Sequence, residues 1–307
     1  MRYESGWKRQ TPIGGQRSKR LNPVWSPDGS TIAFVSEDGL YLVNSQGGEP
    51  QRIFEGRAID DPQWSPDNRQ LAFVQCQYHE RNDTSYIYVV DRDGSNPIRL
   101  ENGSQTVLAT PRWSLDGDYL AYSSSIDSDG DQFCGLEPTG YADAVITTLM
   151  IADKRHNFKS SEVETDLIGF RQLAWMGQET LAYSVKGGHC GWVLHAVNLN
   201  SGNQEIIEHR GILYAWSPAT SSLAYTTCSD GNLHIRDFRL GESWAVWQPG
   251  AAGKIPWSPD GTYLLVTPAE KVPQGPGPAY TQTIWGIHRD GTQAERLTAL
   301  TPTESDK

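Results

Sequence analysis

The sequence predicts an all-β fold, a β-propeller of six four-stranded antiparallel blades, on three observations. A Trp-Ser-Pro-Asp-Gly motif recurs along the chain, and a short apolar strand follows each copy at a nearly fixed offset. Each repeat then continues with two further strands around a Gly-containing turn. Four strands in a repeat of roughly 40 residues are typical of a propeller blade.

The tryptophan motif anchors each repeat. It reads Trp25-Ser26-Pro27-Asp28-Gly29 in the first copy and is degenerate at Trp175-Met176-Gly177. Proline presets φ, aspartate caps its own turn and glycine tolerates positive φ, so the motif predicts a tight turn between two strands. The other copies begin at Trp64, Trp113, Trp216 and Trp257.

The strand after each anchor supports a paired hairpin. Five of the six strands begin seven residues after the tryptophan, and the degenerate fourth copy begins at six. The offset stays nearly constant although the residues around it differ from copy to copy, as two paired strands joined by a tight turn require. The six strands begin at Ile32, Leu71, Leu120, Leu181, Leu223 and Leu264.

Composition restricts the partners of the chain. Among 307 residues the formal net charge is −11, which argues against a nucleic-acid binder because such a protein needs a basic stripe against phosphate. No apolar run is long enough to insert into a membrane. We expect a monomeric propeller at residues 21–300, an N-terminal tail at 1–20 that is a candidate ring-closing strand, and a C-terminal tail at 301–307.

The repeat resembles the TolB-type, WD-like propeller family. Its consensus runs Pro-x-Trp-Ser-Pro-Asp-Gly, then Leu-Ala-Phe, an Ile-Tyr strand and Arg-Leu-Thr, and Arg296-Leu297-Thr298 closes the last copy here. The resemblance covers nearly the whole chain, although TolB itself carries a separate domain ahead of its propeller. It implies a scaffold that binds partners and an extracytoplasmic location. The first twenty residues contain no signal peptide, so the sequence leaves the location open.

The connections between the second and third strands of each blade, here called b–c loops, predict the binding face. They vary widely in length, from Ser36–Gly39 in the first blade to Ser123–Asp143 in the third, and insertions concentrated on one rim are typical of a binding face. Tolerated loop drift is the alternative. Aromatic, histidine and arginine side chains there are the candidate partner-binding residues: Tyr78, His79, Arg81, Phe133, Tyr141, His189, Trp192 and Tyr280.

Calcium is the one candidate cofactor. Asp127, Asp129 and Asp131 alternate in a Gly-containing loop, and such carboxylates can converge on a cation that takes six to eight oxygen ligands. The EF-hand spacing is not met, and a solvated acidic turn is the alternative explanation of the pattern.

The four cysteines leave the redox state open. They fall in or beside the b–c loops, one in each of the second to fifth blades. Cys76 and Cys228 are predicted to lie across the ring from each other, too far apart for a bond. Cys134 and Cys190 could form a disulfide, and free buried thiols are the alternative.

A second candidate site lies at the mouth of the central channel. The connections into the first strands, and these strands themselves, bring mixed charges there. Such a ring suits a polar ligand or a peptide tail, and it is equally what a water-filled axis contains. The residues are Asp60, Asp61, Arg112, Tyr214 and Lys254.

The sequence therefore favours a non-catalytic binding domain that recognises a protein or peptide through its b–c loop face. It contains no G-x-S-x-G, H-E-x-x-H or Gly-rich phosphate loop, and its seven histidines are scattered. No catalytic residue is predicted. The alternative is a propeller lyase or hydrolase acting on a carbohydrate or small polar substrate at the channel mouth.

Overall fold

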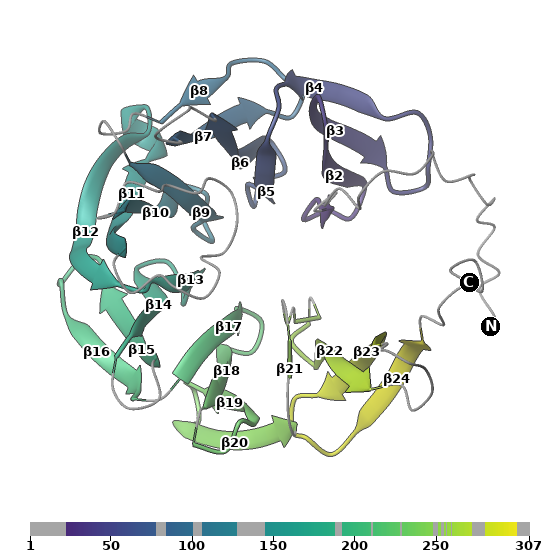
Figure 1. Cartoon of the computed structure of the whole chain (residues 1–307), viewed down its shortest axis with the longest axis vertical. Coiled ribbons are helices and arrows are strands. Elements are labelled where there is room, and N and C mark those ends of the chain that lie inside the picture. The colour runs from purple at the N-terminus through teal and green to yellow at the C-terminus, as the bar shows by residue number, and fades with distance from the viewer. Residues whose placement is uncertain are drawn as a thin grey trace.

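The computed structural model describes residues 23–77, 84–100, 106–127, 145–187, 192–209, 211–227, 229–247, 251–252, 255, 257–258, 260–271 and 280–299. These residues form six four-stranded antiparallel sheets, which follow one another around a central opening as in a propeller (Figure 1). The one helical element in these ranges is the short 3-10 helix η2, Lys154–His156. The predicted all-β fold is confirmed.

Each sheet takes four strands in chain order, here called a to d from the inside of the ring outward. Sheet 1 holds β1 (Val24–Trp25), β2 (Thr31–Ser36), β3 (Gly39–Asn44) and β4 (Gln51–Glu55), and sheet 2 holds β5 (Ile59–Trp64), β6 (Gln70–Gln77), β7 (Thr84–Asp91) and β8 (Ile98–Arg99). Sheet 3 holds β9 (Val107–Trp113), β10 (Tyr119–Asp127), β11 (Val145–Asp153) and β12 (Lys159–Ile168), and sheet 4 holds β13 (Arg171–Trp175), β14 (Thr180–Lys186), β15 (Trp192–Asn198) and β16 (Gln204–Glu208). Sheet 5 holds β17 (Gly211–Ser217), β18 (Ser222–Thr227), β19 (Leu233–Asp237) and β20 (Glu242–Trp247), and sheet 6 holds β21 (Ala251–Ala252), β22 (Tyr263–Lys271), β23 (Tyr280–His288) and β24 (Ala294–Ala299).

The fixed offset after each tryptophan is a hairpin register. Trp64 pairs with Leu71 and Trp113 pairs with Leu120, and the degenerate copy also pairs Trp175 with Leu181. Because the register is set by the turn, one residue fewer in the fourth copy shortens the turn and leaves the pairing intact.

A serine and an aspartate lock this turn in four sheets. Ser26 Oγ donates to Asp28 Oδ1 at 2.6 Å and accepts from the backbone N–H of Thr31 at 3.0 Å. Ser26 is buried, so its hydroxyl satisfies polar groups that would otherwise lack partners. The same 2.6 Å serine–aspartate bond recurs at Ser65–Asp67, Ser114–Asp116 and Ser258–Asp260.

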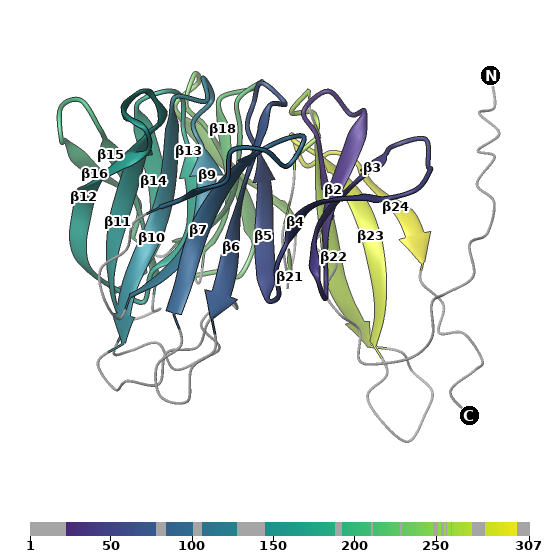
Figure 2. The ribbon, with the colours of Figure 1, turned by 90° about the horizontal axis from the view of Figure 1, so that it is seen from above.

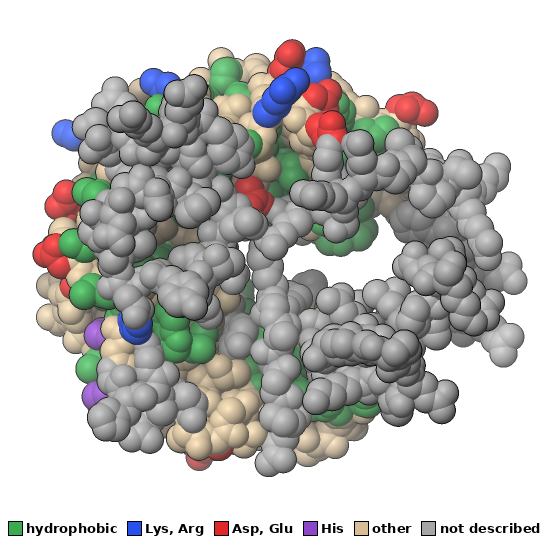
Figure 3. All heavy atoms as spheres, viewed as in Figure 1, with side chains coloured by type: hydrophobic (Ala, Val, Ile, Leu, Met, Phe, Trp, Pro, Cys, Tyr) green, Lys and Arg blue, Asp and Glu red, His purple; other side chains and the backbone are tan. Residues whose placement is uncertain are grey.

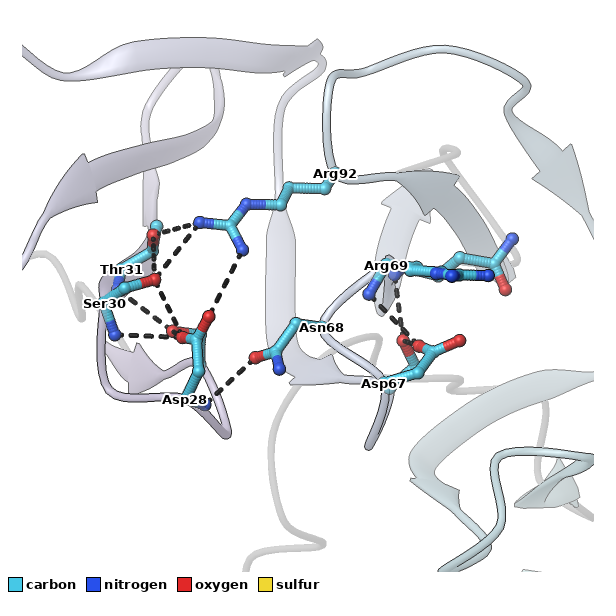
Figure 4. A network of polar contacts seen from close by, with 10 residues as sticks. Asp28, Ser30, Thr31, Asp67, Asn68, Arg69 and Arg92 are labelled. Atoms are coloured by element: carbon cyan, nitrogen blue, oxygen red, sulfur yellow. Dashed lines mark hydrogen bonds and ion pairs between the residues drawn. The ribbon is translucent and has the colours of Figure 1, made fainter.

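Neighbouring sheets are joined at the turns. Arg92, which follows β7 in sheet 2, reaches Ser30 in the a–b turn of sheet 1 and Thr31 at the start of β2, and it lies 3.8 Å from the carboxylate of Asp28 (Figure 4). Its guanidinium also covers the ring of Trp64 at 5.4 Å, a favourable cation–π geometry. Asn68 Oδ1 accepts from the backbone N–H of Asp28 at 3.1 Å.

The tryptophans also join neighbouring sheets, through hydrogen bonds between the inner strands. The indole N–H of Trp175 donates to the carbonyl of Arg112 at 2.9 Å, and that of Trp113 donates to the carbonyl of Gln63 at 3.3 Å. In sheet 6, Trp257 donates in the same way to Ala215 at 3.3 Å. Each acceptor is the residue immediately before the tryptophan of the preceding sheet. These three anchors therefore fix their inner strands to those of the preceding sheets, whereas the indole N–H groups of Trp64 and Trp216 are buried without a hydrogen-bond partner.

The first anchor lacks this environment. Trp25 is 60% exposed, whereas Trp64, Trp113 and Trp175 are 4–8% exposed. Sheets 1 and 6 stand apart in Figure 1. Tyr263 on β22 of sheet 6 is also exposed. Residues 1–20 lie outside the described residues, so the ring-closing strand stays a prediction.

The ring has two unlike ends. The a–b and c–d turns lie at one edge, here called the turn end, at the top of Figure 2. The b–c connections leave from the opposite edge, the b–c end. The strands reach further towards this end than expected: β10 runs to Asp127 and β11 begins at Val145. The expectation of a loop from Ser123 was therefore wrong, because cross-strand pairing continues up to Asp127 and Val145.

Cys76 is disulfide-bonded and buried, which corrects the alternative of free buried thiols for this residue. Its side chain packs in the apolar cluster that joins sheets 2 and 3, together with Leu108 and Tyr122. Its partner is one of the other three cysteines, all of which lie outside the described residues.

The tryptophan hydrogen bond can be tested by a conservative change. Trp175→Phe keeps an aromatic ring but leaves the carbonyl of Arg112 without its donor, so we expect a loss of about 2 kcal/mol in unfolding free energy. Trp25→Phe is the control and should stay within about 0.5 kcal/mol because that side chain is exposed. The measurement is urea unfolding of both variants. Equal losses at the two positions would contradict the model of an exposed first anchor.

The turn carboxylates predict acid sensitivity. The hydroxyl of Ser26, followed by the backbone and hydroxyl of Ser30, lowers the pKa of Asp28 from 3.8 to about 2. Hydrogen bonds from Ser258 and then Thr262 lower the pKa of Asp260 to about 2 in the same way. A depressed carboxyl pKa stabilises the fold above the ordinary value, and that stability is lost as pH falls from about 4 towards 2.

The melting temperature of the double variant Asp28→Asn/Asp260→Asn should therefore fall by less than that of the wild type between pH 4.5 and pH 2.5. Thermal melts across that range provide the measurement. Parallel curves for the two proteins would show that these carboxylates do not carry the acid sensitivity.

The disulfide should join Cys76 to Cys134. Cys76 faces sheet 3, and Cys134 lies in the β10–β11 connection of that sheet. Because a disulfide requires Cα atoms within about 7 Å of each other, we expect the partner of Cys76 to come from this neighbouring sheet. Peptide mapping without reductant should recover this pair. Cys76→Ser should lower stability by about 2–4 kcal/mol, and an equal effect from adding reductant to the wild type is the matched control. Recovery of Cys76 linked to Cys190 or Cys228 would overturn the assignment.

Candidate functional site

A polar cluster lies on the inner strands of sheets 2 and 3. Arg112 Nη1 of β9 lies 2.9 Å from Asp61 Oδ2 of β5, and the two side chains are 26% and 19% exposed. Gln63 Nε2 donates to Asp61 Oδ1 at 3.0 Å, and the backbone N–H of Asp61 donates to Asp60 Oδ1 at 2.8 Å. Acidic side chains are visible beside the central opening in Figure 3.

A repeated backbone irregularity shapes this wall. Asp61, Thr110 and Gln172 have φ values of 46°, 53° and 42°, and each stands three residues before its tryptophan. The register between the a and b strands shifts at each of these places. A β-bulge redirects side chains, and the left-handed conformation costs about 1–2 kcal/mol at a non-glycine residue. The same strained geometry is therefore built into three successive inner strands.

The cluster offers groups for binding a polar ligand. The opposite charges of Arg112 and Asp61 partly cancel each other in their ion pair. The amide and hydroxyl groups beside this pair can donate and accept hydrogen bonds. Gln172 Oε1 is buried and has no hydrogen-bond partner, so this acceptor is unsatisfied in the structure. These groups suit hydroxyl or amide recognition better than the binding of a strongly charged ligand.

The predicted channel-mouth residues are only partly brought together. Asp60, Asp61 and Arg112 lie in the cluster. Tyr214 lies at a register shift of β17, but its side chain is not described, and Lys254 lies outside the described residues. Sequence reasoning missed Gln63, Thr110 and Gln172, although their fixed positions one or three residues before a tryptophan could have identified them.

Most of the predicted partner-binding residues cannot be placed. Trp192 begins β15 and is half-buried, and Tyr280 begins β23, with a side chain that is not described. The other six lie outside the described residues: Tyr78, His79, Arg81, Phe133, Tyr141 and His189.

The calcium hypothesis is likewise untested. Asp127 is the last residue of β10, but its side chain is not described, and Asp129 and Asp131 lie outside the described residues. In the part of the chain that the structure describes, no three His, Cys, Asp or Glu side chains are grouped so as to hold a metal ion. Calcium binding stays a prediction.

The b–c end of sheet 3 presents an apolar row that the sequence did not reveal. Ile126 on β10 pairs with Ile146 on β11, which pairs with Ile168 on β12. The three side chains are 53%, 45% and 50% exposed. Residues 123–127 were expected in a loop, where Ile126 would have had no defined neighbours.

Two histidines of the third strands pack against aromatic rings. His195 stacks on Tyr183 at 5.6 Å, and His234 stacks on Tyr225 at the same distance. Burial lowers the pKa of His195, against an opposing effect of Glu164. Both pairs are cross-strand contacts of the kind that stabilise a sheet, which supports a structural role for these histidines.

Comparison with known proteins identifies the fold but no close relative. No protein-family model matches the chain, and no curated protein matches its sequence. In the described residues no helix is long and apolar enough to cross a membrane.

Solved structures do match. An oligogalacturonate lyase from Vibrio parahaemolyticus superposes with a TM-score of 0.69 at 13% identity, covering 94% of this chain and 79% of that one. TolB from Acinetobacter baumannii gives 0.55 at 15% identity over 88% of this chain and 60% of its own. A puromycin-hydrolysing peptidase from Mycobacterium tuberculosis gives 0.67 at 16%, with coverages of 98% and 49%. The chain therefore has a TolB-like propeller fold, which occurs in proteins of different activities.

Proposed function

We propose that this chain is a non-catalytic propeller that binds a protein or peptide partner through the b–c end of its ring. The observation that carries the proposal is the contiguous row of exposed isoleucines at that end of sheet 3. Contiguous apolar side chains at a surface are typical of an interaction site, whereas single exposed ones need no explanation.

The turn end supports the proposal by contrast. Its a–b turns repeat one serine–aspartate lock in four sheets, so the surface varies little from sheet to sheet. The exposed large apolar side chains in its turns include Leu115 and Leu240, which belong to different sheets and do not adjoin. A partner that needs varied contacts finds them at the opposite end.

The experiment is affinity capture with the tagged chain from an extract of the organism that encodes it. Tyr78→Ala and Phe133→Ala change candidate residues of the b–c loops, and Leu115→Ala and Leu240→Ala are controls at the turn end. The first pair should weaken the captured complex by roughly thirty-fold or more, the effect of losing about 2 kcal/mol at a hot spot. If only the control variants lose the partner while all four stay folded, the wrong end has been chosen.

A second candidate function is a lyase or hydrolase acting on a carbohydrate or small polar substrate at the channel mouth. The strained polar wall around Asp61 and Arg112 favours it, and an oligogalacturonate lyase is among the similar structures. The two candidates are separated by incubating the protein with neutral and acidic oligosaccharides, with and without divalent cations. A product that Asp61→Asn and Arg112→Met abolish, but Leu240→Ala does not, would favour the enzyme.

A further inference from the structure

Apolar clusters join the sheets in consecutive pairs, from sheets 1 and 2 to sheets 5 and 6. In each cluster the later sheet contributes the apolar residue that pairs with its tryptophan and the side chain two residues further along the second strand. These side chains are 0–3% exposed: Leu71, Phe73, Leu120, Tyr122, Leu181, Tyr183, Leu223, Tyr225, Leu264 and Val266. A closed ring of six sheets requires one more junction of this kind, between sheets 6 and 1.

Sheet 1 carries the same apolar positions without a cluster around them. Ile32 and Phe34 on β2 correspond to the buried pairs of the other sheets, but they are only half-buried. Trp25 is 60% exposed and belongs to none of the clusters of the described residues. Figure 3 shows hydrophobic side chains at the edge of the opening between sheets 1 and 6. This face of sheet 1 therefore has the composition of a junction that is not formed here.

Sheet 6 presents an apolar face on its side away from sheet 5. Leu264 and Val266 on β22 are buried in the cluster shared with sheet 5. Because side chains alternate along a strand, Tyr263 and Leu265 lie on the opposite face, where they are 39% and 36% exposed. The sheet that follows sheet 6 around the ring is sheet 1. Two unpartnered apolar faces thus belong to the two sheets that stand apart.

The repeat supplies the geometry by which these faces can meet. Tyr119, the first residue of β10, stands six residues after the tryptophan of sheet 3. Its ring stacks on Trp175 of the following sheet, with the ring centroids 6.4 Å apart. Tyr263 is the first residue of β22 and stands six residues after the tryptophan of sheet 6. Its equivalent partner is the tryptophan of sheet 1, Trp25.

This junction also lacks a charged link that two others have. Arg92 and Lys154 each follow the third strand of their sheet and lie 3.8 Å from a turn carboxylate of the preceding sheet, Asp28 and Asp67 respectively. The corresponding residue of sheet 1 is Ser45, because its backbone N–H makes the same bond to the residue or turn before the second strand. A serine side chain is too short to reach a neighbouring sheet, so the junction between sheets 6 and 1 has less to hold it closed.

We propose that the ring opens and closes at a single seam, between sheets 6 and 1, and that Tyr263 stacks on Trp25 in the closed state. Closure removes apolar surface of both sheets from water, as at the other junctions. The open state gives an extended polymer access to the polar inner wall from the side of the ring. The inference goes beyond the proposed function, because it concerns the ring and holds whichever end binds a partner.

The test is fluorine NMR of the full-length protein labelled with 5-fluorotryptophan. Trp25→Phe assigns the resonance of Trp25 by removing it. Tyr263→Ala should shift that resonance and increase its response to replacing H2O by D2O, because the indole loses the ring that covers it. Tyr119→Ala is the matched reference and should act in the same way on the resonance of Trp175. If Trp175 responds to its variant and Trp25 does not respond to Tyr263→Ala, the stacking is refuted.

A second variant tests the missing charged link. Ser45→Arg places a cation where Arg92 and Lys154 stand in their sheets, so it should favour the closed state and reduce the response of the Trp25 resonance to D2O. Ser201→Arg adds the same charge in an exposed turn of sheet 4 and should leave the resonance unchanged. Thermal melts establish that both variants are folded. An unchanged Trp25 resonance in folded Ser45→Arg would refute a seam that opens and closes.

Two outcomes would assign Trp25 to another occupant and overturn the proposal. If its resonance shifts on dilution of the wild type, in step with dissociation seen by sedimentation, a second copy of the chain covers it. If the resonance responds to Tyr3→Ala/Ile13→Ala but not to Tyr263→Ala, the N-terminal tail covers it. The proposed binding at the b–c end is unaffected by either result.

Discussion

The contact on which the rest of the structure depends is made by the tryptophan that precedes each a–b turn. It pairs with the first apolar residue of the next strand and, in sheets 3, 4 and 6, donates its indole N–H to the preceding sheet. One side chain thus fixes both the register within a sheet and the distance between sheets. Since the acceptor in these three sheets is the residue before the neighbouring tryptophan, each of their inner strands is held in the same relation to the inner strand of the preceding sheet.

This constraint acts at the turn end and on the inner wall, and leaves the b–c end free. The serine–aspartate lock is repeated because it adjoins the tryptophan, and Arg92 and Lys154 each cover the tryptophan of their own sheet. The bulges at Asp61, Thr110 and Gln172 are likewise tied to it by a spacing of three residues. Strand length at the far end is not tied to it, so sheet 3 can extend without disturbing its neighbours.

The parts of the fold that the tryptophan governs could be predicted from the sequence. The second strands were placed correctly because their offset from the anchor is a register, and the turn was predicted because proline, aspartate and glycine each have a defined backbone preference. The projection of sheet 3 could not be predicted. Ser123, Ser124 and Ser125 are typical of a loop, yet they extend β10 because β11 pairs with them, and a tertiary contact overrides local preference.

The inner wall was only half predictable for a related reason. Asp60, Asp61 and Arg112 were identified by their charge. Thr110 and Gln172 are notable only for their positive φ, which their residue types disfavour and which the sequence therefore does not indicate.

A fold shared by a lyase, a peptidase and TolB at 13–16% identity shows that the anchored framework does not determine activity. Function must therefore come from what the framework leaves variable. In this chain the varied features are the polar wall, whose charges are largely satisfied by one another, and the apolar row, whose side chains remain exposed. An ion pair such as Asp61–Arg112 already has its partner, while three adjoining exposed isoleucines gain free energy only when another surface covers them. That asymmetry favours recognition of a partner at the b–c end over chemistry at the axis.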